Sequence, residues 1–152
     1  MLNKTLERLG YNEWFEKTSI DSIQGDFSAA RVVQVNKGNY KVNDGMHEMF
    51  AELSGKLKFS AQNSIDFPTV GDWVAIQVLD DYSLAIVHQV LPRNSLLKRK
   101  EPGKAVEFQL IASNIDYGLI VETADCMLNL NRLERYLAWY DQYVKGVERL
   151  VP

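Results

Sequence analysis

Short runs in which hydrophobic and polar positions alternate fill the middle of the chain. Residues 28–35, "SAARVVQV", and residues 39–43, "NYKVN", flank the tripeptide "NKG". Gly38 can adopt a positive φ angle without steric cost, as a tight hairpin turn requires. The pattern therefore predicts two strands joined by a hairpin.

Three further segments continue this β pattern. They are "MHEMFAELSGKLKF" (46–59), "DWVAIQVL" (72–79) and "SLAIVHQVL" (83–91). In the first of them, Ser54-Gly55 predicts a bulge or bend that turns the strand around a barrel corner. The turn "DDY" separates the other two, and Pro92 should end the last strand because proline cannot continue a central ladder.

Four or five short antiparallel strands between residues 28 and 104 suit a small closed barrel. The OB-fold is the leading candidate. An SH3-like barrel is the competitor, because periodicity alone does not choose between the two. We therefore predict a mainly β fold with an OB-fold-like barrel over residues 28–104.

A short helical lead-in is expected before the barrel, over residues 1–27. In "YNEWFEK", Asn12 can cap a helix, and Trp14 and Phe15 are available to pack on the next unit. We interpret this lead-in as a tether.

The pattern changes again beyond the barrel. A loop is expected over residues 94–107, followed by "YGLIVETA" (117–124), whose consecutive apolar residues predict a strand covered on both faces. Residues 131–145 have the apolar spacing of an amphipathic helix. Asn131 and Glu134 resemble a capping box at its start, and Gly146 fits its C-terminal stop.

This strand and helix form half of a βαβ unit. Residues 105–152 are therefore expected to be the start of a truncated α/β domain. Their apolar face should pack on the barrel or form a homodimer, because such faces rarely stay exposed.

Composition and charge narrow the function classes. The 152 residues are 46% hydrophobic and 24% charged, and the net charge of −3 argues against a uniformly basic nucleic-acid binder. Positive charge is nevertheless concentrated from Arg93 to Lys104, where five basic residues face one acid. The single cysteine, Cys126, cannot form an internal disulfide, so we expect a cytoplasmic protein.

Catalytic motifs are absent from the sequence. Neither Gly-Lys pair, Gly55-Lys56 or Gly103-Lys104, has the following Ser/Thr and upstream glycine of a phosphate-binding loop. Two histidines and one cysteine fall short of a typical structural zinc site. We expect this chain alone to catalyse nothing and to hold no cofactor or metal.

RNA binding has positive indications. A small β-barrel can bind RNA with stacking aromatics and with cations that meet phosphates. Tyr40, Phe59 and Trp73 are the candidate aromatics, although Trp73 is more readily interpreted as barrel core.

Several segments together resemble one known family. "ARVVQVNKGNYKV", "ELSGKLK", "FPTVGDWVAI", "VLPRNSLLKRK", "QLIASNIDYGLIV" and "LNLNRLERYL" occur in this order. They are similar to the amino-terminal part of the ribosome small-subunit-dependent GTPase A family, also called RsgA, YjeQ or EngC.

The resemblance implies an OB-fold, a circularly permuted GTPase domain and a zinc-binding domain in the full-length protein. GTP with Mg²⁺ and a structural zinc ion would belong only to that parent protein, a hydrolase acting in ribosome biogenesis. This chain would be its fragment that docks on ribosomal RNA of the small subunit. The implied RNA-binding residues are Asn36, Lys37, Gly38, Lys41, Lys56, Lys58, Arg93, Lys98, Arg99 and Lys100.

Two other functions remain open. The chain could be a free-standing OB-fold RNA-binding module without GTPase activity, or a protein-interaction barrel, which the net acidity permits.

Overall fold

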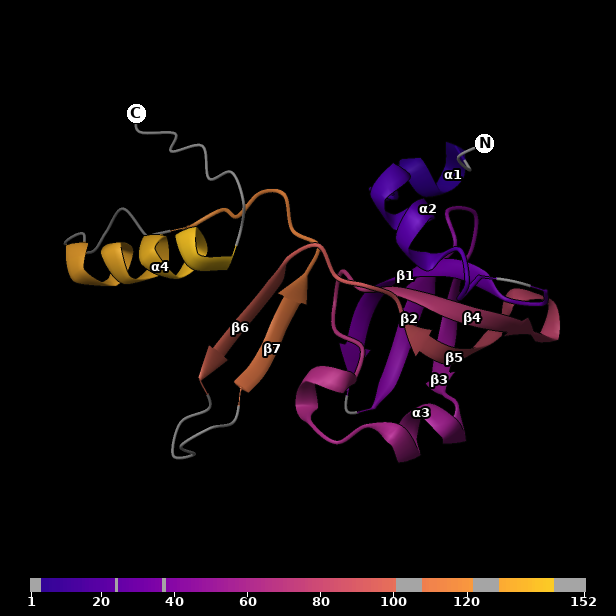
Figure 1. The fold of residues 1–152 in the computed structure, drawn as a ribbon. Helices are drawn as coiled ribbons and strands as arrows, with labels where there is room; N and C mark the ends of the chain where they lie inside the picture. The colour runs from indigo at the N-terminus through magenta and orange to yellow at the C-terminus, as the bar shows by residue number, and fades with distance from the viewer. Residues whose placement is uncertain (1–3, 24, 37, 101–107, 122–128, 144–152) are drawn as a thin grey trace.

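The structure, a computed structural model, describes residues 4–23, 25–36, 38–100, 108–121 and 129–143 (Figure 1). Its centre is a closed five-stranded barrel with the strand order β1-β2-β3-β5-β4. The strands are β1 (Ser28–Asn36), β2 (Asn39–Asn43), β3 (Glu48–Leu53), β4 (Trp73–Leu79) and β5 (Leu84–Val90). The predicted mainly β, OB-fold-like barrel is confirmed.

One pairing in the barrel differs from the antiparallel prediction. β3 and β5 run parallel, with Phe50 opposite Leu84 and Leu53 opposite Val87. The other four pairings are antiparallel. A parallel pair needs a crossover connection rather than a hairpin. The segment between β3 and β5 provides it and includes β4, so this pairing closes the barrel.

The prediction of a bulged strand over residues 46–59 is wrong in its second half. β3 ends at Leu53, and α3 (Gly55–Ser60) follows at one end of the barrel (Figure 1). The Ser54 side chain accepts a hydrogen bond from the Leu57 amide at 3.1 Å, so Ser54 is the N-cap of this helix. A serine that caps a helix and a glycine that breaks a strand give the same local sequence signal.

Alternation along β4 serves two separate cores. Val74 and Ile76 point into the barrel, whereas Trp73 and Ala75 point outward into a second cluster. That second cluster includes Phe15 and other apolar residues of the N-terminal segment. Both faces of β4 are therefore buried, although it belongs to a barrel.

The lead-in is consequently more than the tether that we expected. It forms α1 (Lys4–Glu7) and α2 (Glu13–Ser19), which cover the outer face of the barrel at β4 (Figure 1). Asn12 caps α2 as predicted, accepting from the amides of Trp14 and Phe15 at 3.0 and 3.3 Å. The physical reason for the packing is Trp73, which is fully buried only because the lead-in covers it.

The expected loop after the barrel contains a strand. β6 (Leu96–Lys100) pairs antiparallel with β7 (Phe108–Ser113) in a separate two-stranded sheet. This sheet joins segments from both sides of residue 104, and the proposed domain limits of 1–27, 28–104 and 105–152 stay a prediction. Residues 101–107 lie outside the described residues.

The predicted strand in "YGLIVETA" is wrong for the described residues 117–121. They have no regular secondary structure, and Tyr117, Leu119 and Val121 are 81%, 86% and 88% exposed. A strand covered on both faces needs neighbouring strands and helices, and the described part of the chain places none against this segment.

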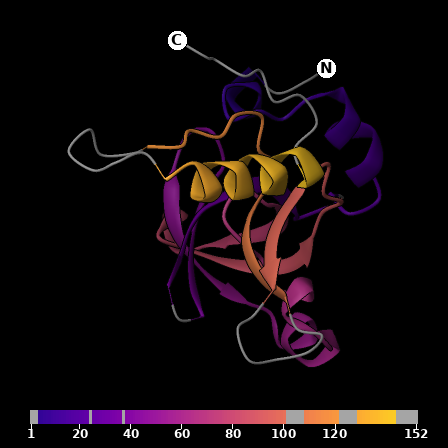
Figure 2. The same ribbon diagram turned by 90° about the vertical axis from the view of Figure 1, so that its left-hand side faces the viewer.

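The last helix, α4 (Leu130–Tyr143), exists as predicted, and Figure 2 shows it crossing in front of the β6–β7 sheet. Its cap differs from the predicted Asn131. The side chain of Asn129 accepts a hydrogen bond from the Arg132 amide at 3.0 Å. The N-cap is therefore Asn129, two residues before the predicted one. Gly146 lies outside the described residues.

Candidate nucleic-acid interface

Two elements carry most of the predicted cations. Lys56 and Lys58 are exposed on α3, and Lys98, Arg99 and Lys100 form the second half of β6. A short 3₁₀ helix, η1 (Ser64–Asp66), follows α3 and connects it to the sheet. The Ser64 hydroxyl donates to the Phe108 carbonyl at 2.7 Å, and Phe108 is the strand partner of Lys100. The fold thus brings the basic half of β6 to the α3–η1 side of the barrel.

The β6 cations are distributed over the two faces of the sheet. The Lys98 ammonium lies 4.4 Å from the centroid of the Phe108 ring, and the Arg99 Nε donates to the Gln109 side chain at 2.7 Å. Lys98 is half-buried and Arg99 is exposed. Cations on a surface of this kind are suited to phosphate contacts. We call Lys56, Lys58, Lys98, Arg99 and Lys100 the basic surface.

The candidate aromatics separate clearly. Tyr40 and Trp73 are buried in the two hydrophobic cores, so neither can stack on a base. Phe59 is 94% exposed on α3, directly after Lys58. A ring this exposed contributes little to packing within the chain and is available to stack on a base.

The β1–β2 turn lies at the same end of the barrel as α3 in both views (Figures 1 and 2). Asn36 is exposed, and Gly38 has a φ of 88°, as the hairpin prediction required. Lys37 lies outside the described residues. Lys41 is turned to the outside of β2, where its ammonium is 3.2 Å from Glu48 and 5.3 Å from the centroid of the Phe50 ring.

Arg93 differs from the other candidates because its guanidinium is engaged within the chain. It donates to both carboxylate oxygens of Asp72, at 2.7 and 2.6 Å, and to the carbonyls of Ile65 and Phe67 at 2.6 and 2.9 Å. Asp72 is fully buried and also accepts from the Ser113 hydroxyl and the Thr69 amide. We call Asp72, Arg93 and Ser113 the clamp.

The clamp was missed by sequence reasoning, although Asp72 and Arg93 both lie in segments that carry the family resemblance, "FPTVGDWVAI" and "VLPRNSLLKRK". Its three residues are 20 to 41 positions apart, and only the fold shows that they meet. A second arginine, Arg31, donates to the carbonyls of Leu9 and Asn114. Burial lowers the pKa of the Arg31 guanidinium, and the charge of Asp116 opposes this.

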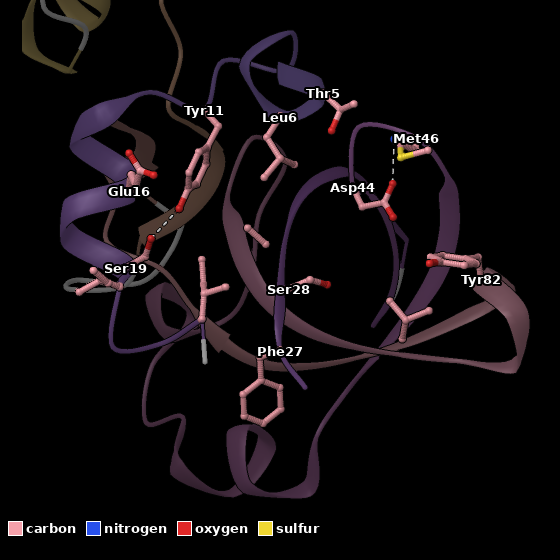
Figure 3. Close-up of a pocket in the computed structure, with 14 residues that line it drawn as sticks. Thr5, Leu6, Tyr11, Glu16, Ser19, Phe27, Ser28, Asp44, Met46 and Tyr82 are labelled. Carbon is pink, nitrogen blue, oxygen red and sulfur yellow. Dashed lines mark hydrogen bonds between the residues drawn. The ribbon is translucent and has the colours of Figure 1, made fainter. Parts of the chain in front are cut away.

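A cleft of about 500 Å³ lies between the N-terminal helices and the barrel (Figure 3). Its walls include Leu6, Phe27 and Met46, and Figure 3 shows Tyr11 and Ser19 hydrogen-bonded at one side, with an O···O distance of 2.7 Å. Burial raises the pKa of Tyr11, and the hydrogen bond to Ser19 opposes this. The cleft has the size of a small-molecule site, and two of its polar side chains, Tyr11 and Ser19, are hydrogen-bonded to each other.

Within the described residues, no group of three His, Cys, Asp or Glu side chains could hold a metal ion. His47 stacks on Tyr82 with ring centroids 4.2 Å apart, and His88 packs on Phe27 at 4.7 Å. Both histidine rings therefore pack on aromatic side chains, and His47 also lies 3.5 Å from the Asp44 carboxylate. Cys126 lies outside the described residues.

No family model matches the chain. Individual relatives do. The chain is 41% identical over 108 residues to small ribosomal subunit biogenesis GTPase RsgA 1 from Oceanobacillus iheyensis, a match covering 71% of this chain and 31% of the relative. It is 32% identical over 143 residues to RsgA from Opitutus terrae, covering 88% of this chain and 39% of the relative.

The chain belongs to the RsgA family. Its matches cover the amino-terminal part of these relatives and span between 31% and 39% of their length. The family resemblance inferred from the sequence motifs is thereby confirmed.

A solved structure shows the same fold. YjeQ from Thermotoga maritima superposes with a TM-score of 0.55 at 19% identity, covering 76% of this chain and 37% of that protein. This similarity supports the OB-fold-like barrel of an RsgA-family member. Among the described helices, none is long and apolar enough to span a membrane.

Proposed function

We propose that the chain is the RNA-docking part of an RsgA-family protein and attaches to ribosomal RNA of the small subunit. The names of its relatives state a role in small ribosomal subunit biogenesis and a GTPase activity. The observation that carries the proposal is the basic surface: α3 presents the exposed Lys56 and Lys58 next to the exposed ring of Phe59, and β6 contributes the consecutive residues Lys98, Arg99 and Lys100.

The proposed interface has a centre and a rim. Its centre is the basic surface with Phe59, and its rim is the β1–β2 hairpin, which carries Asn36 and Gly38. Lys37 stays a candidate from the sequence alone. Lys41, a candidate from the sequence, is left out of the interface because its ammonium is paired with Glu48 beside the Phe50 ring. Arg93 supports the interface by fixing the chain around η1, since all its hydrogen bonds listed above go to residues of the barrel end itself.

GTP hydrolysis, with Mg²⁺ and a structural zinc ion, is proposed for the parent protein only. The sequence of this chain contains neither a GK[ST] phosphate loop nor an NKxD guanine motif. Docking in the cytoplasm on the small subunit would then be the contribution of this part. A homodimer through the exposed apolar residues 117–121 is a further expectation of the same proposal.

Filter binding to purified small-subunit ribosomal RNA over a salt series tests the proposal. If the five cations of the basic surface meet phosphates, the logarithm of the affinity should fall against the logarithm of salt with a slope of roughly −3 to −5. Changing Lys98, Arg99 and Lys100 to glutamine should make that slope shallower by roughly 2 to 3.

Phe59→Ala provides the matched control, because it removes a stacking ring without changing the charge. It should weaken binding by about 1–3 kcal/mol at every salt concentration and leave the slope unchanged. An affinity that does not depend on salt, or a slope that the triple glutamine variant leaves intact, would contradict RNA docking through this surface.

A further inference from the structure

An apolar row crosses the outer surface of the barrel over β3, β5 and β4. The strand register places Phe50 of β3 beside Leu84 of β5, and Leu84 beside Leu79 of β4. These side chains point away from the barrel core, because their neighbours in sequence, such as Ala51 and Ala85, point into it. Phe50 is 62% exposed and Leu79 is 38% exposed.

The turn between β4 and β5 extends this row. That turn, η2 (Asp80–Tyr82), holds Tyr82 with 48% of its surface exposed. Ile86, two residues beyond Leu84, adds a half-buried aliphatic side chain in the next outward position. We call Phe50, Leu79, Tyr82, Leu84 and Ile86 the outer patch.

Acidic residues border the outer patch. Glu48 and Glu52 lie on either side of Phe50 along the outward face of β3, and Asp81 is exposed in the turn next to Tyr82. Asp44 adds a fourth carboxylate in the β2–β3 turn, where it accepts from the amides of Met46 and His47. The basic groups facing this region from the described neighbouring strands and turns are Lys41, which is paired with Glu48, and His47.

The charge of this border excludes RNA as the natural occupant. Four carboxylates against one lysine would repel a phosphate backbone, whereas they attract a cationic protein segment. Lys41 already shows the favoured arrangement, since its ammonium lies over the Phe50 ring and beside the Glu48 carboxylate. Glu52, on the other side of Phe50, offers the same arrangement to a cation from outside the chain.

We propose that the outer patch is a docking surface for a basic protein segment, one that carries lysine or arginine next to an aliphatic or aromatic side chain. The apolar side chain would cover Phe50 and Leu84, and the cations would meet Glu52 and Asp81. The barrel then has two surfaces of opposite chemistry: a basic surface for RNA and an acidic, apolar surface for protein. This second function does not depend on the first.

Amide chemical shifts of the ¹⁵N-labelled chain, titrated with three probes, test the proposal. The probes are a hexapeptide with two leucines between paired lysines, the same peptide with glutamates in place of the lysines, and small-subunit ribosomal RNA fragments. The lysine peptide should shift the amides of Phe50, Glu52 and Leu84. The glutamate peptide and the RNA should leave these three amides unchanged.

Substitutions separate the outer patch from non-specific attraction. Phe50→Ser should weaken binding of the lysine peptide at least threefold, and Glu52→Gln should weaken it in the same direction. Phe59→Ser, which removes an exposed ring on α3, outside the outer patch, should have no effect.

Three results would overturn the proposal. They are an absence of shifts at Phe50, Glu52 and Leu84 with the lysine peptide, equal shifts with the glutamate peptide, and RNA-induced shifts at these amides. Equal weakening by Phe50→Ser and Phe59→Ser would also overturn it, because binding would then not be centred on the outer patch.

Discussion

Gly71, Asp72 and Ser113 meet where the chain leaves the barrel for the β6–β7 sheet. Gly71 has a φ of 91°, and a Cβ atom at this position would lie 2.0 Å from the Ser113 carbonyl oxygen. Asp72 receives the Ser113 hydroxyl and the Arg93 guanidinium. These contacts of Gly71 and Asp72 hold the end of β7 against the segment that precedes β4.

Gly71→Ala should therefore lower the free energy of unfolding by at least about 2 kcal/mol, because it combines a left-handed backbone with a clash against main chain. Gly55→Ala is the control, since Gly55 begins α3 with nothing near its Cβ position. That variant should leave the stability unchanged or raise it by up to about 1 kcal/mol. Denaturant unfolding measures both, and similar effects of the two substitutions would contradict the close approach to Ser113.

Asp72→Ala should destabilise the chain by about 3–5 kcal/mol, because it leaves the Arg93 guanidinium largely buried without its carboxylate. The double variant Asp72→Ala/Arg93→Met should recover part of this loss, since it removes the unpaired charge as well. Thermal unfolding of the two variants checks the order of stability. A double variant no more stable than Asp72→Ala would show that the charge pair is not the cause.

The individual elements were predictable where one strand or helix carries its own signal. The β1–β2 hairpin, β4, β5 and the Asn12 cap follow from alternation, a turn glycine and a capping side chain. α3 was missed because Ser54-Gly55 signals a helix start and a strand bend alike. β6 was missed because its partner strand lies beyond an intervening segment, and local sequence does not reveal a distant partner.

The packing of α2 on the barrel is an element-scale prediction with a clear test. Phe15 is buried against Trp73, with ring centroids 6.0 Å apart. Phe15→Ala should lower the free energy of unfolding by about 3 kcal/mol or more. Lys17→Ala on the exposed side of α2 should change it by less than about 0.5 kcal/mol. Chemical denaturation measures the stability of both variants. If Phe15→Ala lowered the free energy of unfolding as little as Lys17→Ala, the N-terminal segment would be a tether that does not pack on the barrel.

Across the whole molecule, the basic surface and the acidic border of the outer patch lie on different elements of the fold. The basic surface was half visible in sequence, because Lys98, Arg99 and Lys100 are consecutive. The proximity of the β6–β7 sheet to η1, which follows α3, was not visible, since it depends on the Ser64–Phe108 hydrogen bond. The outer patch could not be predicted from the sequence, because its residues come from β3, β4, η2 and β5 and meet only in the folded barrel.

The most direct test of the central claim is co-sedimentation of the chain with purified small ribosomal subunits over a salt series. Two variants accompany the wild type. One carries Lys98→Glu, Arg99→Glu and Lys100→Glu, and the other carries Lys4→Glu, Arg8→Glu and Lys17→Glu on the N-terminal helices. Both variants change the net charge equally, and circular dichroism confirms that each is folded.

We predict salt-sensitive co-sedimentation of the wild type, retained in the N-terminal variant and lost in the β6 variant. If both variants lost binding equally, the attraction would depend on net charge and not on the β6 cations. No co-sedimentation at low salt, or binding that survives reversal of the β6 cations, would contradict docking through the basic surface.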